Sequence, residues 1–330
     1  MPTFASLVGC VKVANRGRQI GNPSLTLLKK ANLQVLLAAV LLVLWPHPAH
    51  AQELAPRAYW PAPNGARVLI ATVARSSGDI IVDPALPIVG VDSDIWFTQI
   101  GFLQTFSLAG RTASVLVNVP YSRGNTEGTV EGEFRSRHLS GMADARVRLA
   151  VNLAGAPTMD RAGFQQLRAA PRMMVGASLE VMLPTGRYSP NRVLNLGTNR
   201  WALRPGFGVI YPITRTWLAE FEVATWFFGD NDDFVGTTRE QAPVMSGSFH
   251  LIKRLRPGFW ASFDLNVYGG GRTTVGGDLR ADLQRNSRMG ATMVFPFKGR
   301  HAIRPSFSLG AVTESGGDFV NMSLTYILLL

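Results

Sequence analysis

The sequence predicts an all-β fold, a transmembrane antiparallel β-barrel of the outer-membrane type with about twelve strands. Three observations predict it. An export signal lies near the N-terminus, and runs of about ten residues with alternating apolar and polar side chains follow it. The last segment is apolar at every second position up to the final residue, Leu330. A closing barrel strand needs this pattern because one of its faces meets lipid.

The export signal has its three parts in the expected order. Lys29 and Lys30 precede an apolar run at 33–45, and Ala49-His50-Ala51 supplies an A-x-A cleavage site. The apolar run is shorter than the roughly 20 residues that span a bilayer as a helix, although an uncleaved anchor is the alternative. The long stretch before Lys29 suggests a misassigned translation start. The predicted organisation is a signal peptide at 1–51, a short periplasmic segment at 52–65 and a barrel at 66–330.

Composition narrows the function. The only cysteine, Cys10, lies in the predicted signal, so we expect no disulfide, Cys–zinc site or thiol nucleophile in the mature chain. Residues 1–51 hold five basic and no acidic residues, which leaves the mature chain 28 basic against 22 acidic residues. These basic residues are scattered, so nucleic acid is not an expected partner. Attraction to anionic lipid head groups, or weak anion preference in a pore, fits better. No cofactor is implied.

Strand periodicity is clearest at 259–267. Phe259, Phe263 and Val267 share one face, whereas Trp260 and Asp264 share the other. The same reasoning predicts strands at 66–75, 94–107, 111–120, 142–154, 173–184, 201–212, 217–228, 244–254, 259–269, 287–296, 301–311 and 318–330.

The connections between these strands are alternately short and long, which is expected when both termini are periplasmic. The segment 156–172 is long on the short side, and its composition predicts a short helix beneath the barrel. A soluble β-sandwich would also show alternating strands. Aromatic residues near predicted strand ends, such as Trp96, Trp201 and Trp217, favour the interfacial belts of a membrane barrel instead.

Several segments resemble a family of bacterial outer-membrane proteins named after the meta-cleavage pathway of phenol degradation and described as transporters. The matching motifs are GMADARVRLAVNL (141–153), GTNRW (197–201), WFFGDNDDF (226–234), RPGFWAS (256–262) with GGRTT (270–274), and QRNSRMGA (284–291). The resemblance implies a bacterial outer-membrane barrel. Its partners would be outer-membrane lipid, lipopolysaccharide, the barrel assembly machinery and a small-molecule solute. Barrel proteins usually end in an aromatic residue that the assembly machinery reads, whereas this chain ends in Leu330, which bears on assembly efficiency.

Charged and polar side chains of both signs fall on the predicted lumen faces. Either they form a polar constriction that selects solutes, or they pair in a salt-bridge network that fills the lumen. The candidate lumen-lining residues are Asp144, Arg146, Arg148, Glu180, Arg204, Glu220, Glu222, His250, Asp264, Arg288 and Arg304.

Two other patterns carry weaker hypotheses. The acidic run 230–233 lacks the later glycine and glutamate of a calcium loop, so a solvated outer loop is the better interpretation. Ser248 and His250 share a strand face, but side chains two residues apart on a strand lie roughly 7 Å apart, too far for a nucleophile and its base. We therefore predict no enzyme activity.

The leading hypothesis is a passive outer-membrane channel or facilitator for uptake of small solutes, with hydrophobic or aromatic compounds as candidates. Only a short segment, 52–65, separates the cleavage site from the first strand. We therefore expect no plug or energy-coupling domain before the barrel. The alternatives are a structural or adhesive barrel with a closed lumen and, more weakly, a membrane-embedded hydrolase.

Overall fold

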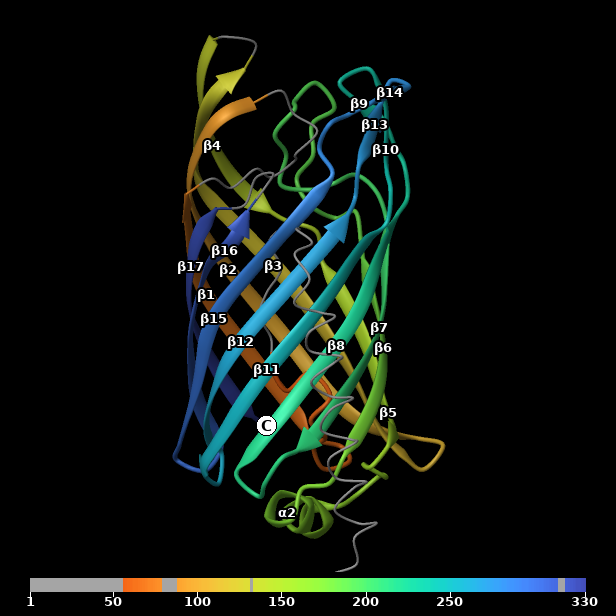
Figure 1. Cartoon of the computed structure of the whole chain (residues 1–330), viewed down its shortest axis with the longest axis vertical. Helices are drawn as coiled ribbons and strands as arrows, with labels where there is room; N and C mark the ends of the chain where they lie inside the picture. The colour runs from red at the N-terminus through yellow and green to blue at the C-terminus, as the bar shows by residue number, and fades with distance from the viewer. Residues whose placement is uncertain (1–55, 79–87, 131–132, 314–317) are drawn as a thin grey trace, which may run out of the picture. The chain divides into compact units, whose positions relative to one another are not determined.

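The structure is a computed structural model that describes residues 56–78, 88–130, 133–313 and 318–330. Its main element is one closed antiparallel barrel with twelve wall positions (Figure 1). Among the described residues, no helix is long and apolar enough to cross a membrane.

The barrel closes because β1 pairs with β17 on one side and with β2 on the other. Two strands, β4 and β5, both pair with β3 at different heights and share one wall position. The wall strands are β1 (Arg67–Gly78), β2 (Ile88–Leu108), β3 (Arg111–Val130), β4 (Glu133–Met142), β5 (Arg146–Ala154), β6 (Met174–Met182), β7 (Ala202–Pro212), β8 (Trp217–Phe228), β11 (Val244–Arg256), β12 (Phe259–Gly270), β15 (Gln284–Phe297), β16 (His301–Thr313) and β17 (Phe319–Leu329).

A second, small sheet lies in the loops at the end opposite α2 (Figure 1). It consists of β9 (Asn231–Phe234), β10 (Thr237–Gln241), β13 (Thr273–Val275) and β14 (Asp278–Leu279). The acidic run 230–233 therefore lies at a hairpin of this small sheet, at the end opposite α2. Within the described residues, no group of three or more His, Cys, Asp or Glu side chains is placed to hold a metal ion.

The side-chain alternation confirms the predicted faces. On β12, Trp260 and Asp264 are buried toward the lumen, whereas Phe263 is exposed on the outer wall. On β15, Arg288 is buried, and Met293 is exposed. A polar interior and an apolar exterior are the reverse of a soluble protein and suit a wall that meets lipid. The closed barrel also excludes the β-sandwich.

Three strand predictions were wrong in their limits. The predicted strand 94–107 begins six residues earlier, at Ile88. The predicted strand 142–154 is interrupted at 143–145, between β4 and β5. The predicted strand 111–120 continues to Val130 because the outer half of β3 pairs with β4. That half contains polar residues and glycine, so it lacks the apolar signal of a lipid-facing strand.

Short turns join strands at one end of the barrel, as predicted. In the turn between β2 and β3, Ala109 and Gly110 both have positive φ, 49° and 73°. Lys298 and Gly299 repeat this between β15 and β16, with φ of 47° and 70°. Two consecutive positive φ values match the right-handed twist of the paired strands.

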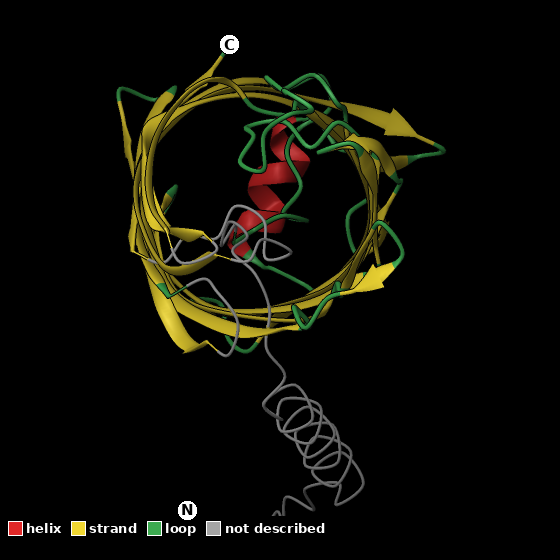
Figure 2. Cartoon of the chain, turned by 90° about the horizontal axis from the view of Figure 1, so that it is seen from above, coloured by secondary structure: helices red, strands yellow, loops and turns green. Residues whose placement is uncertain are grey.

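The same end carries the predicted helix, α2 (Arg161–Ala169), which crosses beneath the bore when the barrel is seen along its axis (Figure 2). Asp160 caps it by accepting a hydrogen bond of 2.8 Å from the Gly163 amide. Leu167 packs in a buried apolar cluster with side chains of the inner wall, including Met174 and Ile252. This apolar cluster therefore holds α2 against the inner wall of the barrel.

Candidate functional site

The segment 57–60 lies inside the barrel, against the inner wall. The Arg57 amide donates a hydrogen bond of 2.6 Å to Glu220 Oε2. The Tyr59 hydroxyl shares one of 3.0 Å with Ser178 Oγ, and Asn152 Nδ2 donates one of 3.2 Å to the Tyr59 carbonyl. We expected a short periplasmic segment at 52–65 and no plug domain. These contacts place residues 57–60 of that segment inside the barrel, and we refer to these four residues as the plug.

Tyr59 occupies a slot that exists because the wall carries glycine there. A Cβ atom at Gly176 would lie 2.3 Å from the Tyr59 ring, and one at Gly208 would lie 2.2 Å from it. Both distances are far inside van der Waals contact, so any larger residue would displace the ring. On another side, the Arg148 guanidinium lies 5.1 Å from the ring centroid. The ring is almost fully buried, at 2% exposed.

Arg57 fixes the start of the plug. Its guanidinium lies 4.1 Å from the centroid of Trp60 and 5.2 Å from that of Trp260. Its φ of 69° is unusual for a residue with a side chain, and the contact with Glu220 holds this conformation. Burial lowers the pKa of Arg57 to about 9, and the nearby Glu220 carboxylate opposes that shift. The guanidinium therefore stays charged at neutral pH.

An ion-pair cluster lies beside the plug and contains several of the predicted residues. Glu222 accepts from Arg204 at 2.7 Å and lies 3.4 Å from Arg148. Farther along the same wall, Arg146 and Glu180 are 3.7 Å apart. Because Arg148 also donates to Ser178, the partner of Tyr59, the cluster and the plug share contacts.

A second row of predicted residues crosses three strands. Strand register aligns Glu220 of β8 with His250 of β11, and His250 with Asp264 of β12. His250 Nδ1 and Asp264 Oδ1 are 2.8 Å apart, and Thr292 Oγ1 donates to the other Asp264 oxygen at 2.8 Å. Asp264 is fully buried, so these bonds compensate for the loss of water around its carboxylate.

The remaining predicted residues lie elsewhere. Arg288 donates to Ser308 at 2.9 Å, and Arg304 donates to Thr325 at 3.4 Å, on other wall strands. Asp144 lies in the break between β4 and β5 and holds a loop. It accepts from the Gly186 amide and from the amide and hydroxyl of Thr198, at 2.7 to 2.8 Å.

We expect Asp144→Ala to loosen the loop 183–201. The substitution leaves three partly buried donors without their acceptor, and each loss costs about 1 kcal/mol. Local opening should rise, and added protease should cut the loop about tenfold faster or more. Limited proteolysis of refolded protein measures this, with Asp230→Ala in an outer hairpin as the control. Equal cutting rates for Asp144→Ala and the unaltered chain would contradict the role of Asp144.

Sequence reasoning missed Arg57 and Tyr59 because the segment before the first strand has no strand periodicity. Its one signal was the sequence Arg57-Ala58-Tyr59-Trp60, which is rich in aromatic rings for a periplasmic linker. The pairing of Arg148 with Glu222 was also invisible, since the two residues are 74 positions apart.

Comparisons with known proteins agree with this architecture. The family model described as "Putative MetA-pathway of phenol degradation" matches residues 88–318. A crystal structure of an outer membrane channel from Pseudomonas putida F1 superposes with a TM-score of 0.70 at 18% identity, covering 84% of this chain and 100% of that one. The transport unit of the autotransporter AIDA-I from Escherichia coli has a TM-score of 0.50 at 10% identity, covering 85% and 93%. No curated protein sequence matches the chain.

Proposed function

The chain belongs to the family described as "Putative MetA-pathway of phenol degradation", and from this premise we propose that it is a passive outer-membrane channel for small solutes. In this proposal, the residues 57–60 narrow its periplasmic end. The observation that carries the proposal is that this constriction is made by a short segment with few contacts to the barrel wall. A short segment occupies the lumen through a few hydrogen bonds and one ring in a glycine slot. Contacts of this kind can break without unfolding the barrel.

The outer surface supports the location in a membrane. Large apolar side chains are exposed around the barrel on the outward faces of the strands, among them Val223, Phe263, Met293 and Leu324. Such a band is costly in water and favourable in lipid. The chain's last residues lie at the end with the short turns, since the Leu330 amide bonds to the Arg67 carbonyl. This supports our placing of that end in the periplasm, where barrel turns are short.

Inward-facing aromatic rings support aromatic solutes as cargo. Trp226 and Phe228 lie near the outer end of β8, with the ring centroids 6.2 Å apart and the planes nearly parallel. Guanidinium groups lie over both rings: Arg146 at 5.7 Å from Trp226, and Arg200 at 4.7 Å from Phe228. Trp226 is only 3% exposed, so a solute would meet Phe228 and the half-exposed guanidinium group of Arg146. Such groups stack with aromatic rings, and the guanidinium group also attracts carboxylates. The description of the family, which refers to phenol degradation, points the same way.

We propose no catalytic role for the Ser248–His250 pair. His250 Nδ1 is bonded to Asp264 within the second row of polar residues, and the two side chains are neighbours along β11. We therefore interpret this row of side chains as part of the polar lining of the lumen and not as a hydrolase site.

Solute flux into liposomes tests the channel proposal. Refolded protein lacking residues 1–51 is placed in liposomes, and swelling is followed with 4-hydroxybenzoate and with gluconate, an aliphatic anion of equal charge. We expect faster swelling with the aromatic anion and loss of that preference in Phe228→Leu. Phe227→Leu, on the outer face of the same strand, is the matched control. No protein-dependent swelling with either anion would favour the structural barrel with a closed lumen.

A further inference from the structure

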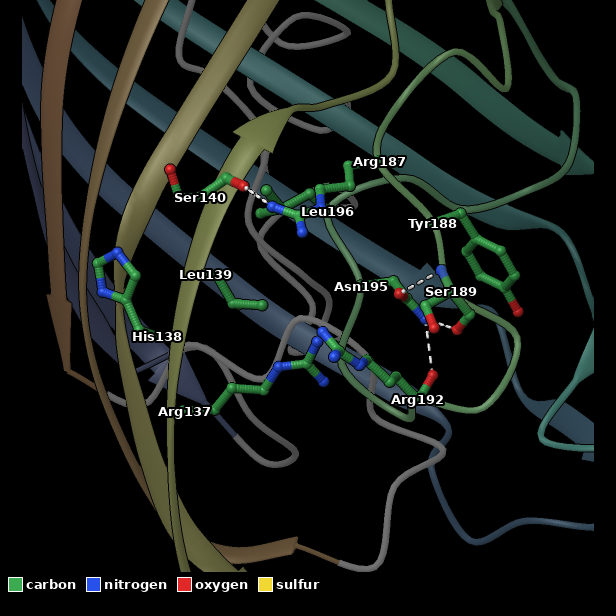
Figure 3. Close-up of a pocket in the computed structure, with 10 residues that line it drawn as sticks. All are labelled: Arg137, His138, Leu139, Ser140, Arg187, Tyr188, Ser189, Arg192, Asn195 and Leu196. Carbon is green, nitrogen blue, oxygen red and sulfur yellow. Dashed lines mark hydrogen bonds between the residues drawn. The ribbon is translucent and has the colours of Figure 1, made fainter.

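Three arginines converge on one cavity at the outer end of the barrel. Arg137 comes from β4, and Arg187 and Arg192 come from the loop 183–201 (Figure 3). The cavity has a volume of about 70 Å³, room for several water molecules. Arg137 and the buried Leu139 are two residues apart on β4 and therefore lie on the same face of the strand, the face that points inward. The long β3–β4 hairpin carries this site beyond the roughly 9–11 residues per strand that span a bilayer.

Positive charge in the cavity is uncompensated by the described residues. No aspartate or glutamate is among the cavity's lining residues. Within the described part of the chain, the Arg137 and Arg192 side chains make no hydrogen bond or ion pair, and Arg187 donates only to the Ser140 carbonyl, at 2.8 Å. Partial burial, followed by the charges of Arg192 and Arg187, lowers the pKa of Arg137. Like charges held together in this way favour a bound anion.

Hydrogen bonds fix the conformation of the loop 183–201, and this holds Arg187 and Arg192 in place at the cavity. Asn195 accepts from the Ser189 amide at 2.9 Å and donates to the carbonyls of Ser189 and Arg192, at 3.1 and 2.6 Å. The Arg187 amide donates to the Met142 carbonyl at 2.8 Å, which fastens the loop to the end of β4. A prearranged site loses less entropy when a ligand binds.

From these observations we propose that the cavity is a binding site for a small oxyanion, a carboxylate or phosphate group, at the outer mouth of the barrel. Guanidinium groups offer paired N–H donors whose geometry matches both groups. Ser189 and the backbone of β4 at His138 and Ser140 also line the cavity. The side chains of His138 and Ser140 lie on the other face of β4, where they bond to Asn125 and Tyr121. The oxyanion belongs either to a dissolved solute or to a phosphate of lipopolysaccharide, which surrounds the outer mouth of such barrels. Anion binding at this cavity does not require that solutes pass through the barrel, so this proposal is independent of the proposed channel activity.

Equilibrium binding tests the site. Protein refolded without lipopolysaccharide is titrated by calorimetry with inorganic phosphate and with 4-hydroxybenzoate. We expect Arg137→Gln and Arg192→Gln each to weaken binding about tenfold or more, because each removes charge-assisted hydrogen bonds. Arg137→Lys keeps the charge but not the paired donors and should restore part of the affinity. Arg280→Gln, an exposed arginine in another outer loop, should bind like the unaltered chain.

The same variants are tested for binding to vesicles that contain lipopolysaccharide. If the unaltered chain binds the dissolved anions and the arginine variants do not, the site is supported and its ligand is a dissolved solute. If the unaltered chain binds only the vesicles and the same variants lose that binding, the site is supported and its ligand is a lipopolysaccharide phosphate. The proposal is overturned if neither is bound, or if binding is unchanged in Arg137→Gln and Arg192→Gln. Conductance or flux does not enter this test, so its failure is distinct from failure of the channel proposal.

Discussion

Gly208→Ala is expected to open the channel. The added methyl group would lie 2.2 Å from the Tyr59 ring, so the ring must leave its slot. The plug then loses the hydrogen bond between Tyr59 and Ser178 and the packing of Arg148 on the ring. The barrel itself should tolerate alanine, since β7 pairs with β6 and β8 through backbone atoms. We expect ionic conductance through planar bilayers to rise severalfold.

A matched control lies two residues away on the same face. A Cβ at Gly206 would be 3.0 Å from Ser178 Oγ and 3.3 Å from the Tyr59 hydroxyl, contacts that small shifts relieve. Gly206→Ala should therefore change conductance far less than Gly208→Ala. Tyr59→Ala should reproduce the large increase, whereas Tyr211→Ala on the outer wall should not. Equal conductance in Gly208→Ala and the unaltered chain would show that Tyr59 does not limit the pore.

Glu222→Gln is expected to cause a large loss of stability. Glu222 is the carboxylate partner of both Arg148 and Arg204, and all three side chains are at most 15% exposed. Removing this charge leaves two buried guanidinium groups with no carboxylate within 4 Å among the described residues, although Glu180 still acts on Arg148 from farther away. Removing one partner of a buried pair costs about 3–5 kcal/mol. The free energy of unfolding in urea, followed by tryptophan fluorescence of protein folded in lipid vesicles, measures the loss.

The control is Glu240→Gln, which alters an exposed carboxylate in the outer loops and should leave stability within about 0.5 kcal/mol. The double variant Glu222→Gln with Arg204→Met should recover part of the loss, since it removes one of the two stranded charges. An unchanged unfolding midpoint in Glu222→Gln would mean that the ion pairs contribute nothing net. The same variant should also shift ion preference toward anions, because it makes the lumen more positive.

The wall of the barrel was predictable because its signal is local. Residues such as Phe263 and Asp264 alternate between lipid and lumen, and that period of two is visible in the sequence. The same alternation placed Glu222, His250 and Asp264 inside. It failed for the half of β3 that pairs with β4, because residues 121–130 are mainly polar or glycine and show no apolar face.

The constriction was not predictable because it depends on closure of the barrel. The slot for Tyr59 is made by Gly176 and Gly208, which meet only when β6 and β7 pair. The role of Asp144 could not be predicted either, because it also depends on contacts between distant segments. Its position in an alternating run predicted a strand residue, but three donors from the loop 183–201 surround its carboxylate, and the strand breaks there. The roles of the lumen charges in selectivity stay predictions.

The most direct test of the central claim is single-channel conductance of refolded protein in a planar bilayer, with and without the residues 52–60. The account predicts a small, steady conductance for the chain that retains the plug and a severalfold larger one for the chain that lacks it. Folding of both chains is checked first by their resistance to unfolding in detergent. Two folded barrels that both stay silent would contradict the account and would identify a barrel whose lumen is closed by more than its N-terminal segment.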